Sequence, residues 1–437
     1  MEKLLELAKK VSDKAEVYST EYTYSPVSFE NAKLHEINST FQSGLSLRII
    51  KDGKLGFAYT CNLINREEFL QNALDSLKGG VEAGYDFPLT ENIRPLDTYD
   101  PSLENLTGTQ MVAECDRVSD ILKVKTDAEL SLTSFKHIEK IRIMNSEGTD
   151  ISERSSFYGL FGQAIFPGSG SGIYRYYQSK NFGETPDSYL NEIIDGYNIA
   201  AKPVEPSGGK MKVIFMPNSM ITLNWRILSG LNSKSVYEKT SPIADKLNQK
   251  IFDEKITIYS DPTNTEYPGA RAFDDEGVPG APLALVESGE LKSFFYDLNF
   301  ACKLNAVSTG HGYKTTQWGG DAITLKPTPA LPHMRIKTGD KSFAELVKSI
   351  DRGVIIEGAL GAHSGNIPNG DYSIGVSPGL YVENGEIIGR VKEAMISGNI
   401  YDTLKNVVDI GDTLYPTFSG AWVPPILFDN VSVATKK

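Results

Sequence analysis

Cysteine is scarce in this sequence, because the 437 residues include only Cys61, Cys115 and Cys302. No two of them form a Cys-x-x-Cys pair, the spacing typical of redox dithiols and of many zinc sites. Because paired thiols are missing, we predict three reduced, buried cysteines in a reducing compartment. A cysteine nucleophile would need a histidine close by in space, and nothing in the sequence pairs the two residue types.

Long apolar segments and an excess of positive charge are also missing. No apolar run reaches the roughly 18–20 residues needed to cross a bilayer. The N-terminal MEKLLELAKKV has charges between its leucines, as in an amphipathic helix and not as in a secretory signal. The chain carries 44 Lys and Arg against 56 Asp and Glu, whereas nucleic-acid binding relies on a basic face. We therefore expect a cytoplasmic protein that binds neither membranes nor nucleic acid.

Histidine is too sparse for the usual zinc peptidase motif. The five histidines are all more than seven residues apart, whereas a zincin needs two of them one helical turn apart and a glutamate that activates water. Only His35 is followed by Glu, and Ser39 and Thr40 stand where a second imidazole would fall. The sequence therefore predicts neither a catalytic residue nor a metal ligand in this chain.

What the sequence does contain is enough for two folded domains. A chain of 437 residues and 48.0 kDa can bury two cores, and its 10% aromatic content favours β-structure and surfaces that could hold peptide. The segment 202–210, KPVEPSGGK, has two prolines and two glycines and is the predicted boundary. We expect an N-terminal domain at 1–201, a C-terminal domain at 202–437, and an α+β fold.

The N-terminal domain is predicted to combine an antiparallel sheet with helices. Asp52-Gly53 is a strong two-residue hairpin turn, because both of its positions need positive φ. It joins strands predicted at 45–50 and 55–60. The Gly-rich PGSGSG at 167–172 is predicted to be a flexible link. Further strands are expected at 16–24 and between 128 and 166, and helices at 66–77, 110–123 and 188–200.

The C-terminal domain is predicted to be mostly antiparallel β-structure, curled into a sheet or barrel. It opens with a strand at 211–216 and a helix at about 219–231. A later helix at 343–350 has a capping box formed by Ser342 and Glu345. Other strands are expected at 256–259, 282–287, 291–296, 372–376, 380–383 and 386–391.

Two long segments of this domain carry a family resemblance. Residues 273–310 read FDDEGVPGAPLALVESGELKSFFYDLNFACKLNAVSTG, and residues 358–385 read GALGAHSGNIPNGDYSIGVSPGLYVENG. With a looser match of GLSLRIIKDGKLGFAYT at 44–60, they resemble the TldD/PmbA family, the so-called modulators of gyrase. The resemblance implies a two-subunit metalloprotease that acts on peptides. In it a TldD-type subunit carries zinc and a PmbA-type subunit, also called TldE, does not.

The resemblance also shows where the family's metal motif would lie. In the zinc-bearing type, HExxxH follows the first strand of the C-terminal domain. Alignment on the Thr-Ser at 240–241 places Asn224, Trp225 and Ser229 at the positions of His, Glu and His. The family's cysteine ligand is also missing from the tail at 413–430, TLYPTFSGAWVPPILFDN. This implies a metal-free, PmbA/TldE-like subunit, with zinc expected only in a TldD-type partner.

Three places in or next to the matched segments are candidates for binding substrate, and each has two interpretations. Asp274, Asp275 and Glu276 could attract a cation or a peptide amino terminus, or could cap backbone amides ahead of the turn at 277–279. The loops with His311 and Tyr313 and with His363 could hydrogen-bond a peptide backbone, or could be ordinary turns with exposed imidazoles.

The leading hypothesis is a PmbA/TldE-type subunit that completes a chamber for unfolded peptides and pairs with a TldD-type subunit. Alone, the chain is expected to form a homodimer. One alternative is a self-sufficient homodimeric peptide-binding or scaffold protein. Another is an independent hydrolase in which Asp275 acts with His311.

Overall fold

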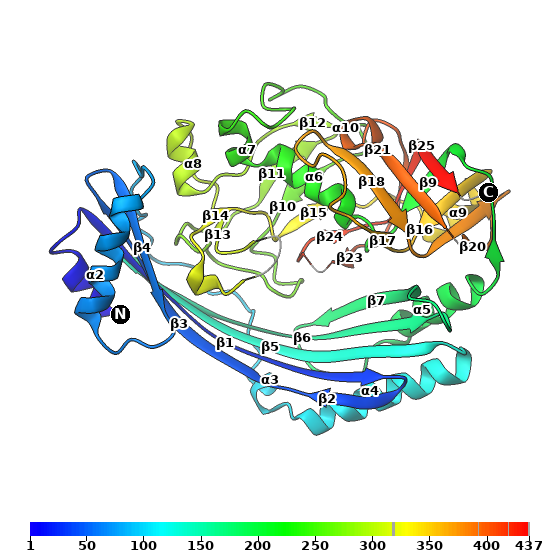
Figure 1. Cartoon of the computed structure of the whole chain (residues 1–437), viewed down its shortest axis with the longest axis horizontal. Coiled ribbons are helices and arrows are strands. Elements are labelled where there is room, and N and C mark those ends of the chain that lie inside the picture. Colours follow the sequence, from blue (N-terminus) through cyan, green and yellow to red (C-terminus); the bar gives the residue numbers. More distant parts are fainter. Residues whose placement is uncertain (317–319, 392, 418, 436–437) are drawn as a thin grey trace.

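A seven-stranded antiparallel sheet forms the N-terminal half of the molecule (Figure 1). The computed structural model describes residues 1–316, 320–391, 393–417 and 419–435. The sheet has the order β4-β3-β1-β5-β6-β7, and β2 pairs with β1. Its strands are β1 Lys14–Glu30, β2 Lys33–Ile37, β3 Thr40–Lys51, β4 Lys54–Thr60, β5 Glu129–Asn145, β6 Asp150–Ile165 and β7 Gly172–Ser179.

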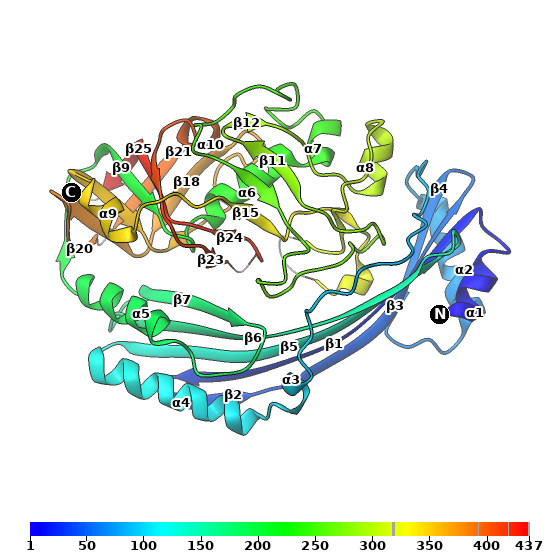
Figure 2. The same cartoon turned by 180° about the vertical axis from the view of Figure 1, so that it is seen from behind.

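Helices cover one face of this sheet, and the C-terminal half of the chain lies over the other (Figures 1 and 2). The long helices α4 and α5 pack against apolar side chains of β1, β5 and β6, while α1 and α2 close the end of the sheet near the hairpin of β3 and β4. The N-terminal helices are α1 Glu2–Ala8, α2 Arg66–Ser76, the 3-10 turn η1 Leu77–Gly79, α3 Ser102–Asn105, α4 Gly108–Lys125 and α5 Asp187–Ile199.

Two predicted turns have different outcomes. Asp52 and Gly53 adopt φ of 50° and 70°, as a type I′ turn requires, so the hairpin prediction is confirmed. The segment 167–172, predicted to be a flexible link, forms the tight connection between β6 and β7. The backbone N–H of Phe166 donates to the carbonyl of Ser171 there. Composition alone does not distinguish a glycine-rich turn from a linker. The segment is a turn here because the strands on either side of it pair with each other.

The C-terminal half is built on a curled ten-stranded sheet of order β17-β18-β21-β25-β9-β16-β19-β20-β8, with β22 paired to β25. Most neighbours are antiparallel, but β9 with β16 and β8 with β20 are parallel. The strands are β8 Pro203–Val204, β9 Gly209–Phe215, β16 Arg352–Ile356, β17 Ala359–Leu360, β18 Asp371–Val376, β19 Gly379–Glu383, β20 Glu386–Val391, β21 Ala394–Asn399, β22 Val407–Ile410 and β25 Ile426–Thr435.

Two smaller sheets and several short helices complete this half. The six-stranded sheet has the order β12-β11-β10-β15-β24-β23, and β13 pairs with β14. Their strands are β10 Ile258–Ser260, β11 Leu283–Glu287, β12 Glu290–Leu291, β13 Gly312–Tyr313, β14 Thr328–Pro329, β15 Met334–Ile336, β23 Tyr415–Pro416 and β24 Trp422–Val423. The helices are α6 Ile221–Leu231, α7 Ser233–Tyr237, α8 Leu298–Lys303, the 3-10 turn η2 Ala322–Thr324, α9 Phe343–Lys348 and α10 Ile400–Thr403.

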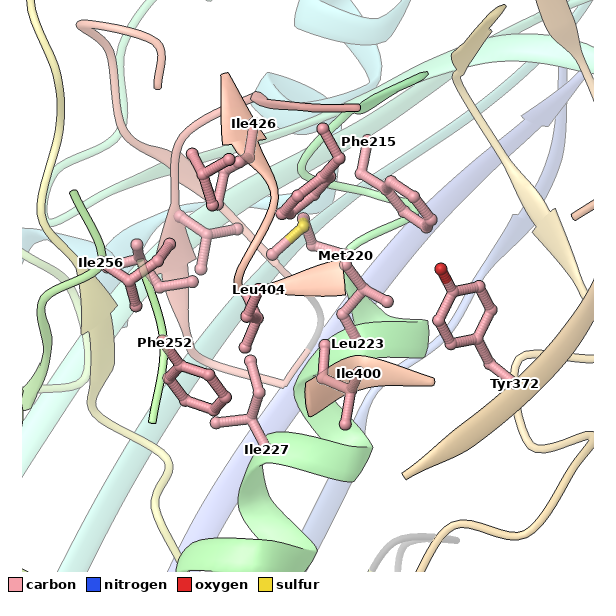
Figure 3. Close-up of a cluster of buried hydrophobic side chains, with 14 of the residues drawn as sticks. Phe215, Met220, Leu223, Ile227, Phe252, Ile256, Tyr372, Ile400, Leu404 and Ile426 are labelled. Carbon is pink, nitrogen blue, oxygen red and sulfur yellow. The ribbon is translucent and has the colours of Figure 1, made fainter. Parts of the chain in front are cut away.

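A large apolar core joins the two main sheets of the C-terminal half. Leu223 and Ile227 project from one side of α6 into this core, beside Phe215 of β9 and Ile426 of β25 (Figure 3). Two turns of helix therefore lie against the sheet, which fixes the direction of every other side chain on α6. This matters because α6 carries the three residues that the family resemblance aligns with a metal motif.

The expected α+β class is confirmed, with an N-terminal antiparallel sheet and a curled C-terminal β-structure. The strand predicted at 291–296 is mostly wrong, because β12 ends at Leu291. The prediction of three buried cysteines is wrong for Cys61 and Cys302, which are exposed, and correct for Cys115. In the described part of the chain, no helix has both the length and the apolar character required to cross a membrane.

Candidate functional site

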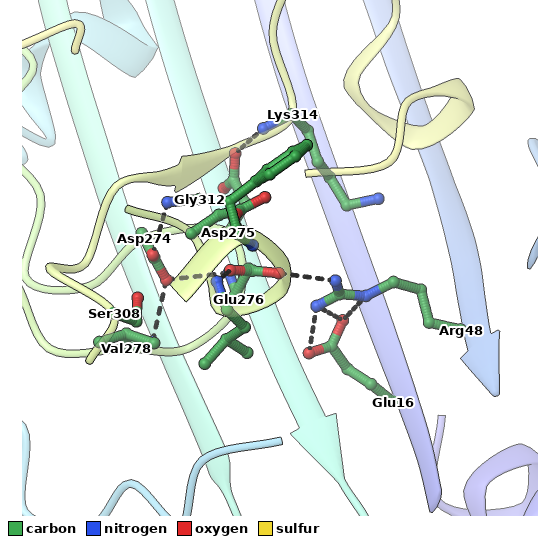
Figure 4. A network of polar contacts seen from close by, with 12 residues as sticks. Glu16, Arg48, Asp274, Asp275, Glu276, Val278, Ser308, Gly312 and Lys314 are labelled. Atoms are coloured by element: carbon green, nitrogen blue, oxygen red, sulfur yellow. Dashed lines mark hydrogen bonds and ion pairs between the residues drawn. The ribbon is translucent and has the colours of Figure 1, made fainter. Parts of the chain in front are cut away.

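The acidic triplet Asp274, Asp275 and Glu276 lies in the interior, where the C-terminal half meets the N-terminal sheet (Figure 4). The three residues expose 0%, 5% and 1% of their surface. Asp274 accepts hydrogen bonds from the backbone N–H groups of Glu276 at 3.0 Å, Val278 at 2.9 Å and Gly312 at 2.8 Å. These bonds hold its own turn and β13 in place. The placement favours the structural one of the two roles considered for the triplet.

Glu276 joins the two halves through a buried arginine. Arg48 on β3 donates from Nη1 to Glu276 at 2.9 Å, and it holds Glu16 on β1 by two bonds of 2.8 Å. Glu276 also accepts from the backbone N–H of Leu298 at 2.7 Å. Burial raises the pKa of Glu16 to about 7, and the charge of Arg48 opposes that rise. The contact fastens a C-terminal turn to the N-terminal sheet through charge-assisted hydrogen bonds.

Asp275 belongs to a second arginine contact between the halves. Its carboxylate accepts from Arg271 at 3.0 Å and from the backbone N–H of Lys314 at 2.7 Å. Arg271 also forms an ion pair with Glu153 on β6. Burial first, and then the positive charge of Arg48, lowers the pKa of Lys314 to about 7. The carboxylates of the triplet therefore belong to a buried charge network that spans both halves.

His311, expected in a polar loop, is fully buried. Its Nδ1–H donates to the carbonyl of Thr309 at 2.8 Å, and its Nε2 accepts from the hydroxyl of Ser260 at 3.0 Å. Tyr313 is buried too, and its hydroxyl has no hydrogen-bond partner in the described structure. In the described part of the chain, Asp275 and His311 share no hydrogen bond, because each is bonded to other groups. The hydrolase alternative therefore lacks the contact that a general base needs.

The burial of His311 makes the stability of the fold depend on pH. Burial lowers its pKa to about 4, from an unperturbed 6.5, so the unfolded chain takes up a proton first as the pH falls. The stabilisation is complete above pH 6.5 and is lost as the pH falls towards 4, by about 3 kcal/mol. We expect His311→Gln to remove this part of the pH dependence, measured as urea unfolding free energies at a series of pH values.

His35→Gln is the matched control for this measurement, because His35 is exposed. It should leave the pH dependence of the unfolding free energy unchanged. If the unfolding free energy of His311→Gln falls at acid pH by as much as that of the unsubstituted protein, His311 is not the source of the pH dependence.

Helix α6 carries the three positions where the resemblance places the metal motif. Asn224 is buried, and Trp225 and Ser229 are partly buried. Neither polar atom of the Asn224 amide has a hydrogen-bond partner in the described structure. Amide, indole and hydroxyl groups are not the thiolate, imidazole and carboxylate ligands that zinc prefers. In the described residues, no group of three or more His, Cys, Asp or Glu side chains could hold a metal ion. The residues at these positions do not fit zinc.

Arg226, which sequence reasoning missed, ties α6 to the loop that bears His363. Its buried guanidinium donates at 2.6–2.9 Å to the carbonyls of Thr222, Ala362, Ser364 and Asp371. The carbonyls of Ala362 and Ser364 flank His363, which is itself exposed. The glycine-rich loop is therefore fastened to the helix at its backbone while the imidazole faces outwards. An arginine within an apolar helical pattern was the available signal.

The sheet face that looks toward the C-terminal half carries a group of rings, here named the aromatic face. Tyr24 on β1 pairs with His137 on β5, which pairs with Phe157 on β6, so their side chains lie on one face. Glu153 lies on this face too, four residues before Phe157, and it contacts Arg271 of the C-terminal half. The aromatic face comprises Tyr22, Tyr24, Phe135, His137, Phe157, Phe161, Tyr174 and Tyr176, all partly exposed except Phe135.

Ring contacts make the aromatic face continuous across four strands. Tyr24 lies 5.4 Å from Phe135, centroid to centroid, and Phe135 lies 6.1 Å from Tyr176 on β7. His137 and Phe157 are 5.2 Å apart. These spacings are typical of stacked and tilted aromatic pairs. Partly exposed rings of this kind offer apolar contact area at a small entropy cost, as peptide-binding surfaces do.

A small open pocket lies where β7 meets the turn before α6, at the end of the aromatic face. It measures about 260 Å³ including the solvent at its mouth, and it is lined by Arg175, Tyr176, Met216, Pro217, Asn218, Tyr415 and Pro416. Arg175 makes the third arginine contact between the halves, donating to Glu357 at 2.8 Å and to Glu192 on α5 at 2.9 Å. The aromatic face is therefore bounded by buried ion pairs at both ends.

Two domain models of one known family match the chain, one in each half. The profile described as PmbA/TldA metallopeptidase C-terminal domain matches residues 208–435, and the one described as PmbA/TldA metallopeptidase domain 1 matches residues 15–82.

Individual relatives match over nearly the full length. A metalloprotease of Methanothermobacter thermautotrophicus is 27% identical over 404 residues, which cover 89% of this chain and 85% of the relative. A metalloprotease PmbA homolog of Haemophilus influenzae is 25% identical, covering 98% and 94%. The crystal structure of TldE from Thermococcus kodakarensis superimposes with a TM-score of 0.89 at 22% identity and covers 99% of each chain. At that identity the last match supports the fold alone.

Proposed function

This chain belongs to the PmbA/TldA metallopeptidase family, and from that premise we propose that it is the PmbA/TldE-type subunit of a cytoplasmic two-subunit peptidase. The observation that carries the proposal is the chemistry of α6. The family resemblance aligns Asn224, Trp225 and Ser229 with the two imidazoles and the carboxylate of the zinc-bearing type, and none of these three side chains is a zinc ligand. A lost single ligand could be replaced by a neighbour, but no neighbouring group of ligands exists among the described residues. The zinc would belong to a TldD-type partner.

The role of this subunit would be to hold unfolded peptides near the partner's active site. The aromatic face supports this role, because its partly exposed rings offer apolar contact area to an extended peptide. The partly exposed rings of Tyr24 and Phe157 lie near the middle of that face. Catalysis itself would depend on the partner, since the buried His311 and Asp275 have no free groups with which to activate water.

The decisive experiment compares the purified chain, a TldD-type partner and the co-expressed pair in a peptidase assay with unfolded peptides. We expect no cleavage by this chain alone, chelator-sensitive cleavage by the pair, and no zinc in the chain by elemental analysis. About one zinc per chain, together with unaided cleavage, would overturn the proposal. Peptide binding without any effect of a partner would instead favour the stand-alone homodimeric scaffold.

Variants of this chain in the same assay test its part in holding substrate. Tyr24→Ala with Phe157→Ala removes two rings from the aromatic face and should raise the KM of the pair by about tenfold with little change in kcat. Phe41→Ala is the matched control, because this exposed ring lies on the opposite face of β3. Equal effects of the two changes would argue against the aromatic face as a peptide surface.

A further inference from the structure

A carboxylate lies among the rings of the aromatic face. Glu139 on β5 pairs in register with Tyr22 on β1 and with Ser155 on β6, so its side chain is on the same face of the sheet as the rings. His137, two residues earlier, belongs to the aromatic face itself. The side chains of Glu139 and His137 expose 23% and 24% of their surface. Both are therefore open to a ligand that lies on the rings.

Glu139 has no cation close enough to neutralise it. Its Oε1 accepts from the hydroxyl of Thr20 at 3.2 Å, and its Oε2 lies 3.9 Å from Nε2 of His137, too far for a hydrogen bond. In the described part of the chain, no lysine or arginine lies within ion-pair distance of it. Burial opposes its ionisation, but His137 and the charge of Arg271 outweigh burial and lower the pKa of Glu139. It is therefore a carboxylate at neutral pH.

Basic side chains of the same strands point away from the aromatic face. Lys136 donates to the carbonyl of Leu103 in α3, and Arg175 forms an ion pair with Glu192 on α5, so both are directed to the face that the helices cover. In the described strands, register pairing places no lysine or arginine among the rings. The sheet therefore contributes negative charge to the aromatic face and no permanent positive charge.

A second carboxylate lies at the same end of the aromatic face. Gln42 on β3 is the register partner of Tyr22 and donates a hydrogen bond to Asp321. Burial, and then the charges of Asp321 and Glu139, raise the pKa of the Tyr22 phenol. Both carboxylates therefore act electrostatically on one ring of the aromatic face.

Arg271 of the C-terminal half does not cancel this negative charge. Its guanidinium already forms ion pairs with Glu153 and Asp275, so with Glu139 it is one cation against three carboxylates. The net charge of the whole chain, −12, adds a field of the same sign. The faces of aromatic rings also attract cations. A cationic group on a bound peptide is thus complementary to this surface.

We propose that the aromatic face selects extended peptides that carry a lysine or arginine side chain, and that Glu139 is the residue that recognises the charge. The proposal rests on the peptide-holding function and names a substrate class for it. The cationic side chain would lie beside the Glu139 carboxylate and against the ring of Tyr22, and so gain an ion pair and a cation–π contact. An acidic side chain at the same place would be repelled.

The test is a titration of the full chain by fluorescence anisotropy with three labelled peptides that differ only in a central lysine, glutamine or glutamate. Both peptide ends are blocked, and the dye and the other residues are uncharged. Measurement at about pH 8 keeps an unperturbed imidazole neutral, so that His137 does not compete for Glu139. We expect the lysine peptide to bind about tenfold more tightly than the glutamine peptide, and the glutamate peptide to bind most weakly.

Substitutions assign the preference to Glu139. Glu139→Gln keeps the size of the side chain and an acceptor for Thr20, and it should bring the affinities for the lysine and glutamine peptides close together. Glu21→Gln is the matched control, because Glu21 is exposed and directly precedes Tyr22, on the opposite face of β1. It removes the same charge from the chain and should preserve the tenfold preference. Equal loss of the preference in both variants would overturn the assignment, because the net charge would then be its source.

Gln42→Lys provides an independent measurement if Glu139→Gln does not fold. Gln42 is partly exposed and lies in the same cross-strand row as Glu139, so an ammonium group there should also cancel the preference for the lysine peptide. A tenfold preference that survives in these variants would overturn the role of Glu139. Equal binding of the three peptides by the unsubstituted chain would overturn the selectivity and leave the peptide-holding function standing. Failure of all three to bind would overturn that function as well.

Discussion

Arg48→Met is expected to lower the free energy of unfolding by about 3–5 kcal/mol, the range for removing one partner of a buried ion pair. Methionine keeps an apolar stem but leaves Glu16 and Glu276 as buried carboxylates with no cation of their own. Both are almost completely buried, so water cannot replace the guanidinium. The measurement is equilibrium unfolding in urea, followed by circular dichroism.

The matched control for Arg48→Met is Arg154→Met. Arg154 pairs with Glu104 at the surface, where both side chains are nearly half exposed, and a pair of this kind contributes about 0–1 kcal/mol. The loss in Arg48→Met should also shrink at acid pH, because protonation neutralises the abandoned carboxylates. A loss no larger than that of Arg154→Met would show that the contact does not hold the halves together.

The local features of the fold could be predicted, because their causes are local. The Asp52-Gly53 turn follows from the φ values that a type I′ turn demands, and the helix after Ser342 follows from its capping box, which the structure contains. The strand expected at 16–24 is too short, because β1 runs from Lys14 to Glu30, and β5 and β6 are similarly long. Each runs for 16 or 17 residues, and its burial changes along its length as different elements cover it, so no single period-2 pattern persists.

The buried charges could not be predicted for a different reason. Arg48 and Glu276 are 228 residues apart in sequence, and a charged residue in a strand normally indicates an exposed position. His311 was expected in an exposed loop because glycines flank it, yet it lies in the interior directly before β13. The aromatic face arises only from register, since Tyr24, His137 and Phe157 come from three strands. Single sequences contain no signal for such convergence.

The second large effect on the unfolding free energy is expected at Arg175, which makes the third arginine contact at the other end of the sheet. Arg175→Met should lower the free energy of unfolding by about 3 kcal/mol, because Glu357 remains buried without its cation. Glu192 contributes less to the loss, since its side chain is partly exposed. Hydrogen exchange should rise in β7 and in the turn before α6, where Asn218 bonds to the backbone of β7.

The double variant Arg48→Met, Arg175→Met tests whether the two contacts act independently. They lie on β3 and β7, which are four strand spacings apart in the sheet, or roughly 19 Å. For sites so distant that share no partner, the two losses of unfolding free energy should be additive within about 0.5 kcal/mol. If the double variant loses much less unfolding free energy than the two single variants together, breaking either contact already separates the halves. In that case the aromatic face would be held under the C-terminal half by both ends together, and each arginine would be necessary for the surface that binds peptide.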